Sequence, residues 1–230
     1  SDGSIANGTE PWRTPEESEL PAIDLPQDIP AGDYQVYARD SGTLARPWVA
    51  PGTPGLEHCL GGLEKQDVSG KVSHDSANHQ RMVQLRMEKI KGIAKDIPEL
   101  TVFGPAQGDL LVLGWGGTFG AIHHAVERAQ RRGLSVAASQ LDYLNPFPAN
   151  LANVLRSYRQ VLIPELNAGQ LKILIRAQFL IDATGLNKIT GQPFRTSEIE
   201  LEILRLLGVH DGSGADSPCS TETVHGTMGA

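Results

Sequence analysis

The chain has 230 residues and a formal net charge of −7 at pH 7, with 40% hydrophobic and 20% charged residues. This length suffices for one or two domains with a real hydrophobic core, and the composition is typical of a globular protein. The acidic balance disfavours nucleic-acid binding, which uses a basic surface. No apolar run approaches the roughly 20 residues that a membrane-spanning helix needs, so we expect no membrane partner.

The amino terminus and the cysteines bear on the cellular compartment. Residues 1–4 are polar and there is no initiator Met, so we expect no secretory signal and a segment of a longer, cytoplasmic polypeptide. Cys59 and Cys219 form neither a CxxC pair nor a disulfide framework, which fits a reducing compartment. Two thiols are too few for a four-iron cluster, which takes about four. Any such cluster is therefore expected in another chain.

The first 57 residues are predicted to form an extended, proline-rich arm, because prolines recur throughout and break any regular ladder. Apolar and aromatic side chains are spread along the arm, so we expect it to pack on a surface, with a flexible linker as the alternative. A glycine-studded loop follows at 55–71 and contains Glu57 and His58. A carboxylate beside an imidazole is able to do acid–base work or bind a ligand; the alternative is two solvated loop residues.

A helix is predicted from Ser76 to Ile97, capped by Asp75 or Ser76 and ended by Pro98. Apolar residues spaced by four and three positions share one face; they are Val83, Met87, Ile90, Ala94 and Ile97. Most of the remaining surface is basic, through Arg81, Arg86, Lys89, Lys91 and Lys95. A solvated face is one interpretation, and contact with an acidic partner or a phosphate is the other.

Three short apolar runs then alternate with helical patterns, at 109–114, 134–139 and 161–165. Such an alternation predicts βαβ units and a mostly parallel sheet with flanking helices, an α/β fold. Continuous Val, Ile and Leu runs are typical of strands buried on both faces. A short helical piece precedes the third run.

The glycine turn after the first run, at 114–120, leads into a helix that Thr118 could cap. Glycines there allow close approach of a ligand, and the helix start suits an anion. The turn lacks the dinucleotide fingerprint, because Phe119 stands where the third glycine belongs. A ligand-free strand–helix turn and a non-catalytic nucleotide-binding domain both remain open. The predicted buried stripe of this helix is Phe119, Ile122, Val126 and Ala129, and Gly133 is placed to end it.

Polar residues also follow the third run, where open α/β sheets bind ligands or build interfaces. Glu165, Asn167 and Gln170 lead into an apolar helix expected at 171–181. They are candidate interface residues, with Asn167 as a plain helix N-cap the alternative. A short strand or loop at 185–194 and a last helix to about Leu207, capped by Thr196 or Ser197, precede a polar tail that we expect to be flexible.

Several stretches together resemble the C-terminal part of the alpha subunit of 2-oxoacid:ferredoxin oxidoreductases, in particular the 2-oxoglutarate type. They include SDGSIANGTEPWR, GTPGLEHCLGGLEK, NHQRMVQLRMEKI, DLLVLGWGGTFGAI, LDYLNPFPANL, VLIPELNAGQL and GQPFRTSEI. The resemblance implies a domain similar to the transketolase C-terminal domain at 51–207. Residues 1–50 would end a pyrimidine-type thiamine-diphosphate domain and form a linker arm, and 208–230 would be the tail.

The resemblance also implies a function. Enzymes of this family convert 2-oxoglutarate, CoA and oxidised ferredoxin to succinyl-CoA, CO2 and reduced ferredoxin. Thiamine diphosphate, Mg2+ and a 4Fe–4S cluster are expected in a beta subunit, with a second alpha subunit as a further partner. The segment would then support assembly and border the active site rather than catalyse alone. Candidates near substrate or CoA are Glu57, His58, Gly114, Gly116 and Thr118. Another 2-oxoacid such as pyruvate, or a purely structural scaffold, remains an alternative.

Overall fold

The computed structural model describes residues 15–20, 22, 32 and 34–209, so the expected tail beyond Val209 and part of the expected arm lie outside the described residues. The strands are β1 (Gly108–Trp115), β2 (Val136–Leu141), β3 (Tyr158–Glu165) and β4 (Thr184–Asn187). The α-helices are α2 (Ser76–Gly92), α3 (Phe119–Arg131), α4 (Leu151–Arg156), α5 (Gln170–Phe179) and α6 (Thr196–Leu206). Three short 3-10 helices are η1 (Glu17–Glu19), η2 (Ile93–Lys95) and η3 (Gly116–Thr118). None of the described helices is long and apolar enough to cross a membrane.

The four strands form one parallel sheet in the order β2-β1-β3-β4. The central strand β1 pairs with β2 from Leu110 opposite Val136 and with β3 from Gly108 opposite Tyr158. Leu110 to Leu113 are completely buried, because helices cover both faces of the sheet. The predicted parallel α/β sheet is confirmed. The strands begin and end within two or three residues of the apolar runs that predicted them.

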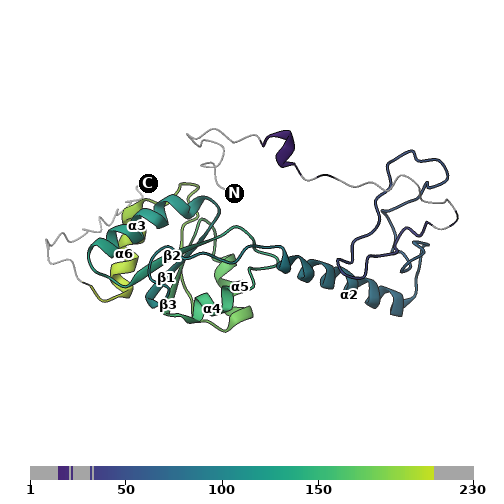
Figure 1. Cartoon of the computed structure of the whole chain (residues 1–230). Coiled ribbons are helices and arrows are strands. Elements are labelled where there is room, and N and C mark those ends of the chain that lie inside the picture. Colours follow the sequence, from purple (N-terminus) through teal and green to yellow (C-terminus); the bar gives the residue numbers. More distant parts are fainter. Residues whose placement is uncertain (1–14, 21, 23–31, 33, 210–230) are drawn as a thin grey trace, which may run out of the picture.

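Two hydrophobic cores lie on opposite faces of the sheet (Figure 1). On one face α3 and α6 pack through Ile122, Val126, Ile199 and Ile203. On the other, α4 and α5 contribute Leu151, Leu155, Leu171 and Ile175. Alternate residues of β1 point to the two cores, as the two-residue period of a strand requires. The flanking helices predicted from the sequence are thus present.

The helix α2 extends away from the sheet, and loops from residues 34–75 gather around its amino-terminal half (Figure 1). Asp75 caps it by accepting hydrogen bonds from the backbone N–H groups of Ala77 and Asn78 at 3.2 and 3.1 Å, as predicted. The side chain of Asn78 ties the loops to the helix through the backbone of Lys65 and Asp67. The helix ends at Gly92, earlier than predicted, and continues as the 3-10 turn η2.

Two local predictions are wrong. Phe119 was expected in the buried stripe of α3 but is 54% exposed; Ala125 is buried instead, beside Ile122, Val126 and Ala129. Phe119 is the first residue of α3, directly after η3, and its side chain lines the edge of the sheet rather than the core. The N-cap of α6 is Arg195, not Thr196 or Ser197.

The start of α6 is held by Glu198, whose carboxylate accepts a hydrogen bond from the backbone N–H of Arg195 at 2.6 Å and another from Lys188 at 2.9 Å. The Arg195 backbone bond first, and then the Lys188 bond, hold the pKa of Glu198 below its ordinary value of 4.5. Because the folded-state pKa is the lower one, this stabilisation is complete above pH 4.5 and is lost as the pH falls through the folded-state pKa. We expect Glu198→Gln to remove this part of the acid dependence of the unfolding midpoint. An unchanged acid dependence in the variant would contradict the assignment.

Candidate functional site

The glycine turn lies at the carboxyl edge of the sheet, directly after β1. Gly116 has φ +58°, a left-handed conformation that favours glycine. Thr118 stands at the N-cap position of α3 but does not cap it: its hydroxyl donates to the carbonyl of Trp115 at 2.9 Å and accepts from the Trp115 N–H at 3.3 Å. The predicted capping role of Thr118 is therefore wrong, and its hydroxyl closes the turn instead.

Glu165 ends β3 and is completely buried. Its carboxylate accepts hydrogen bonds from the backbone N–H groups of Leu171 and Lys172, at 2.8 and 3.0 Å, and from the indole N–H of Trp115 at 3.3 Å. The first two donors belong to the first turn of α5, whose free N–H groups and positive dipole end suit an anion. Glu165 thus joins the turn after β1 to the helix after β3.

The loop after β3 is held by Asn167, whose side-chain oxygen accepts from the N–H groups of Gly169 and Gln170 at 2.7 and 3.2 Å. The N-cap of α5 is Gly169, in a left-handed conformation with φ +98°, so the prediction of Asn167 at this position is wrong. Asn187 at the end of β4 donates to the carbonyl of Asn167 at 3.1 Å. Gln170 is exposed at the start of α5. Of the three candidate interface residues, Glu165 is internal, whereas Asn167 and Gln170 lie nearer the surface.

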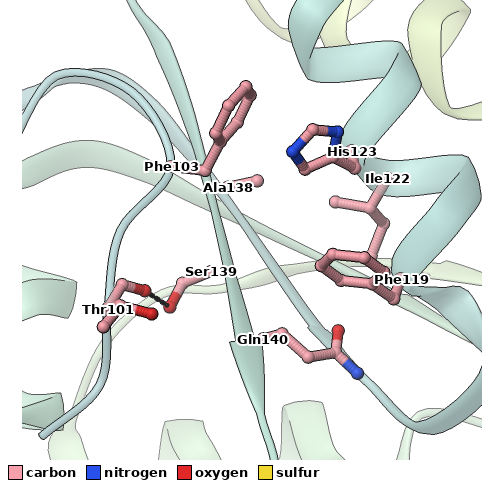
Figure 2. A pocket seen from close by; sticks show the side chains of 8 residues that line it. All are labelled: Thr101, Phe103, Phe119, Ile122, His123, Ala138, Ser139 and Gln140. Carbon is pink, nitrogen blue, oxygen red and sulfur yellow. Dashed lines mark hydrogen bonds between the residues drawn. The ribbon is translucent and has the colours of Figure 1, made fainter.

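A small apolar slot of about 80 Å3 opens beside the glycine turn, between the end of β2 and the start of α3 (Figure 2). The ring of His123 lies 4.0 Å from that of Phe103 and 5.5 Å from that of Phe119, centroid to centroid. Two polar side chains of the slot are hydrogen-bonded within the protein: Ser139 donates to the carbonyl of Thr101 at 2.6 Å, and Gln140 donates to that of Gly116 at 3.1 Å. The slot therefore suits one planar ring or a short aliphatic group.

Sequence reasoning did not find this slot. The bridge between Phe103 and Ala138 that forms one wall links residues far apart in the chain. The one local signal is Phe119, a large apolar residue directly after a glycine turn, and the helical periodicity assigns it to the core instead.

Glu57 and His58 belong to the loops before α2, and these loops lie at the other end of that helix from the sheet (Figure 1). They border a hollow of about 350 Å3 formed by residues of the 49–60 segment. His58 lies 2.7 Å from the carbonyl of Leu56 through Nδ1 and 3.4 Å from the hydroxyl of Tyr34 through Nε2. Both ring nitrogens thus have partners, and Glu57 is exposed. The structure does not bring this pair together with the glycine turn.

The part of the chain that the structure describes contains no group of three or more His, Cys, Asp or Glu residues that could hold a metal ion. Cys59, the one cysteine among these residues, is exposed and unpaired. The carboxyl edge of the sheet thus offers shape, backbone groups and an apolar slot rather than an assembled catalytic constellation.

Comparison with known proteins shows what the chain is related to. The chain is 50% identical over 200 residues to the 2-oxoglutarate oxidoreductase subunit KorA of Mycobacterium tuberculosis, a match that covers 86% of this chain and 30% of the relative. The chain is a relative of the 2-oxoacid:ferredoxin oxidoreductase alpha subunits. It is also 27% identical to the 2-oxoacid:ferredoxin oxidoreductase subunit alpha of Saccharolobus solfataricus, over 60% of this chain and 23% of the relative. The resemblance seen in the sequence motifs is confirmed.

A solved structure supports the same relationship. The 2-oxoglutarate:ferredoxin oxidoreductase of Magnetococcus marinus, solved with 2-oxoglutarate, coenzyme A and succinyl-CoA bound, matches with a TM-score of 0.75 and 27% identity, over 84% of this chain and 34% of that chain. No family model matches the chain. The chain spans about a third of the length of the alpha subunits that it matches.

Proposed function

We propose that the chain works as part of a 2-oxoglutarate:ferredoxin oxidoreductase, which makes succinyl-CoA, CO2 and reduced ferredoxin from 2-oxoglutarate, CoA and oxidised ferredoxin. The observation that carries the proposal is the 50% identity to KorA, a 2-oxoglutarate oxidoreductase subunit, over 86% of this chain. The Magnetococcus marinus enzyme, whose structure holds 2-oxoglutarate and CoA, adds support for the substrate class. We place the assembly in a reducing compartment, the cytoplasm, in keeping with the exposed thiol of Cys59.

The family's iron–sulfur cluster does not fit the donor groups of this chain. A 4Fe–4S cluster takes about four thiolates, and the chain has two cysteines. We therefore propose that the cluster, thiamine diphosphate and Mg2+ are held by a beta subunit. Thiamine diphosphate supplies the carbanion chemistry there, and this chain contributes shape and contacts. A second alpha subunit and ferredoxin complete the proposed partners.

Within that assembly we propose that the carboxyl edge of the sheet borders the active site or a partner subunit. The turn residues Gly114, Gly116 and Thr118 set its outline, and Asn167 and Gln170 are the contact candidates. Glu57 and His58 remain candidates for a separate contact near substrate or CoA. We retain residues 51–207 as the proposed domain, with 1–50 as the arm and 208–230 as the tail.

The test is CoA-dependent reduction of a viologen dye by the purified native complex, with 2-oxoglutarate and pyruvate compared at equal concentration. We expect turnover with 2-oxoglutarate that stops when CoA is omitted, because the acyl group then has no acceptor. Turnover with pyruvate alone would retain the family but change the substrate. A complex that carries its cluster and thiamine diphosphate but turns over neither 2-oxoacid would contradict the proposed function.

A further inference from the structure

One side of α2 is apolar and uncovered in the part of the chain that the structure describes. Val83, Met87 and Ile90 are spaced by four and three residues, the a/d spacing of helices that pair side by side. Met87 is 54% exposed and Ile90 is 39% exposed. Met82 is the one residue of α2 that is fully buried, and it faces the loops rather than this stripe.

The exposure of this apolar face bears on the stability of α2. Most helical stability in a folded protein comes from packing an apolar face rather than from helix propensity. The described loops pack on one side of α2, through the hydrogen bonds of Asn78 and through the hollow that Met82, Arg86 and Lys89 help to line, and they leave Met87 and Ile90 exposed. A regular helix with an exposed, evenly spaced apolar stripe is therefore a surface that a second element is expected to cover.

The charges beside the stripe indicate what kind of element. Arg86 and Lys91 occupy the positions that flank an a/d stripe and select its partner by charge. The nearby acid, Glu88, points roughly 160° away from Ile90 around the helix, at about 100° per residue. Among the described residues, no carboxylate pairs with Lys89 or Lys91, whereas Arg86 pairs with Glu64 at 3.4 Å.

A basic hollow adjoins this face and strengthens the same preference. It measures about 230 Å3, and its lining includes four cations, Arg39, Arg46, Arg86 and Lys89. Arg39 is neutralised by Asp67 at 2.5 Å, and Arg46 donates to a backbone carbonyl. Positive charge thus gathers at one place on a chain whose net charge is −7, so the surface attracts an acidic partner.

We propose that the Val83–Met87–Ile90 stripe of α2 docks an amphipathic helix with acidic flanking residues, carried by a partner subunit. The proposal rests on the proposed function only in taking that partner to be another subunit of the oxidoreductase complex. A second copy of this chain is the less suitable occupant, because Arg86 and Lys91 would then face like charges. The occupant buries Met87 and Ile90 and pairs its carboxylates with the flanking cations.

The first experiment identifies the occupant directly. A photo-crosslinking amino acid replaces Met87 in the full-length subunit, the complex is assembled and irradiated, and the joined peptides are sequenced by mass spectrometry. We expect a peptide of a partner subunit with acidic residues at helical spacing. A matched probe at Glu88 gives fewer adducts, because it points away from the stripe. Adducts within the same chain, with a second copy, or none above the Glu88 control, would overturn the proposal.

The second experiment measures the strength of docking. Met87→Gln with Ile90→Gln is expected to weaken assembly of the purified subunits about tenfold or more, because two apolar anchors are lost. Glu88→Gln places the same new side chain on the opposite side of the helix, and its assembly affinity is expected to stay within about twofold of wild type. Lys91→Glu weakens assembly most at low salt. Assembly of the double variant as tight as wild type would overturn the inference even if the complex turns over 2-oxoglutarate. An inactive complex whose assembly follows these expectations would instead count against the proposed function alone.

Discussion

Replacing Glu165 with Ala is expected to destabilise the protein by roughly 2–5 kcal/mol, because two backbone N–H groups of α5 lose their acceptor inside the protein. The carboxylate is completely buried and bonds to Leu171, Lys172 and Trp115. Water does not replace it at a site with no exposed surface. Urea unfolding followed by circular dichroism measures the loss as a lower midpoint with an unchanged slope.

Two further variants separate the cause. Glu165→Gln keeps one oxygen acceptor, so its free energy of unfolding is expected to fall by less, about 1–2 kcal/mol. Glu127→Ala removes an exposed carboxylate that pairs with Arg131 at 2.8 Å on α3, and it stays within about 0.5 kcal/mol of wild type. If Glu165→Ala behaves like Glu127→Ala, the buried carboxylate does not hold the loops together as inferred.

The sheet was predictable from the sequence because its strands are buried on both faces. Runs such as Leu110 to Leu113 have no polar side, and every residue in this run is completely buried. Helix ends were less predictable. Asp75 caps α2 as expected, but the α5 start depends on Glu165, a residue of the preceding strand that sequence spacing does not connect to it.

The candidate site was predictable only as a location. Loops after parallel strands meet at one edge, which placed the glycine turn and Asn167 correctly. The apolar slot depends on Phe103, which reaches β2 through backbone hydrogen bonds with Ala138 at 2.8 and 2.9 Å. Such a long-range contact leaves no periodic signal. The periodicity of α2 was predicted correctly for Val83, Met87 and Ile90 but not for Ala94 and Ile97, because the α-helix ends at Gly92. Periodicity shows that a face is apolar and not what covers it.

Adding a single methyl group at Gly114 is expected to destabilise the protein by roughly 1–3 kcal/mol through overpacking. A Cβ there would lie 2.5 Å from the terminal methyl of Ile122, 2.7 Å from the side-chain oxygen of Gln140 and 3.1 Å from the hydroxyl of Thr118. Ile122 is almost fully buried, so its side chain is packed on all sides, and Gly114 is in the central strand, paired with Gln140 of β2. Crowding of Gln140 by the added Cβ also disturbs its hydrogen bond to the carbonyl of Gly116, which joins the turn to the slot.

Two other glycines of the same segment separate steric crowding from backbone strain. Gly116 has open space around its Cβ direction but φ +58°, so Gly116→Ala costs about 1–2 kcal/mol through the left-handed conformation alone. Gly120 is in α3 with open space and an ordinary φ, so Gly120→Ala stabilises by roughly 0.5–1 kcal/mol. The unfolding midpoint should therefore fall for Gly114→Ala and Gly116→Ala and rise for Gly120→Ala. A neutral or stabilising Gly114→Ala would mean that Ile122 and Gln140 yield at no cost, and that the absence of a side chain at position 114 does not shape this edge of the sheet.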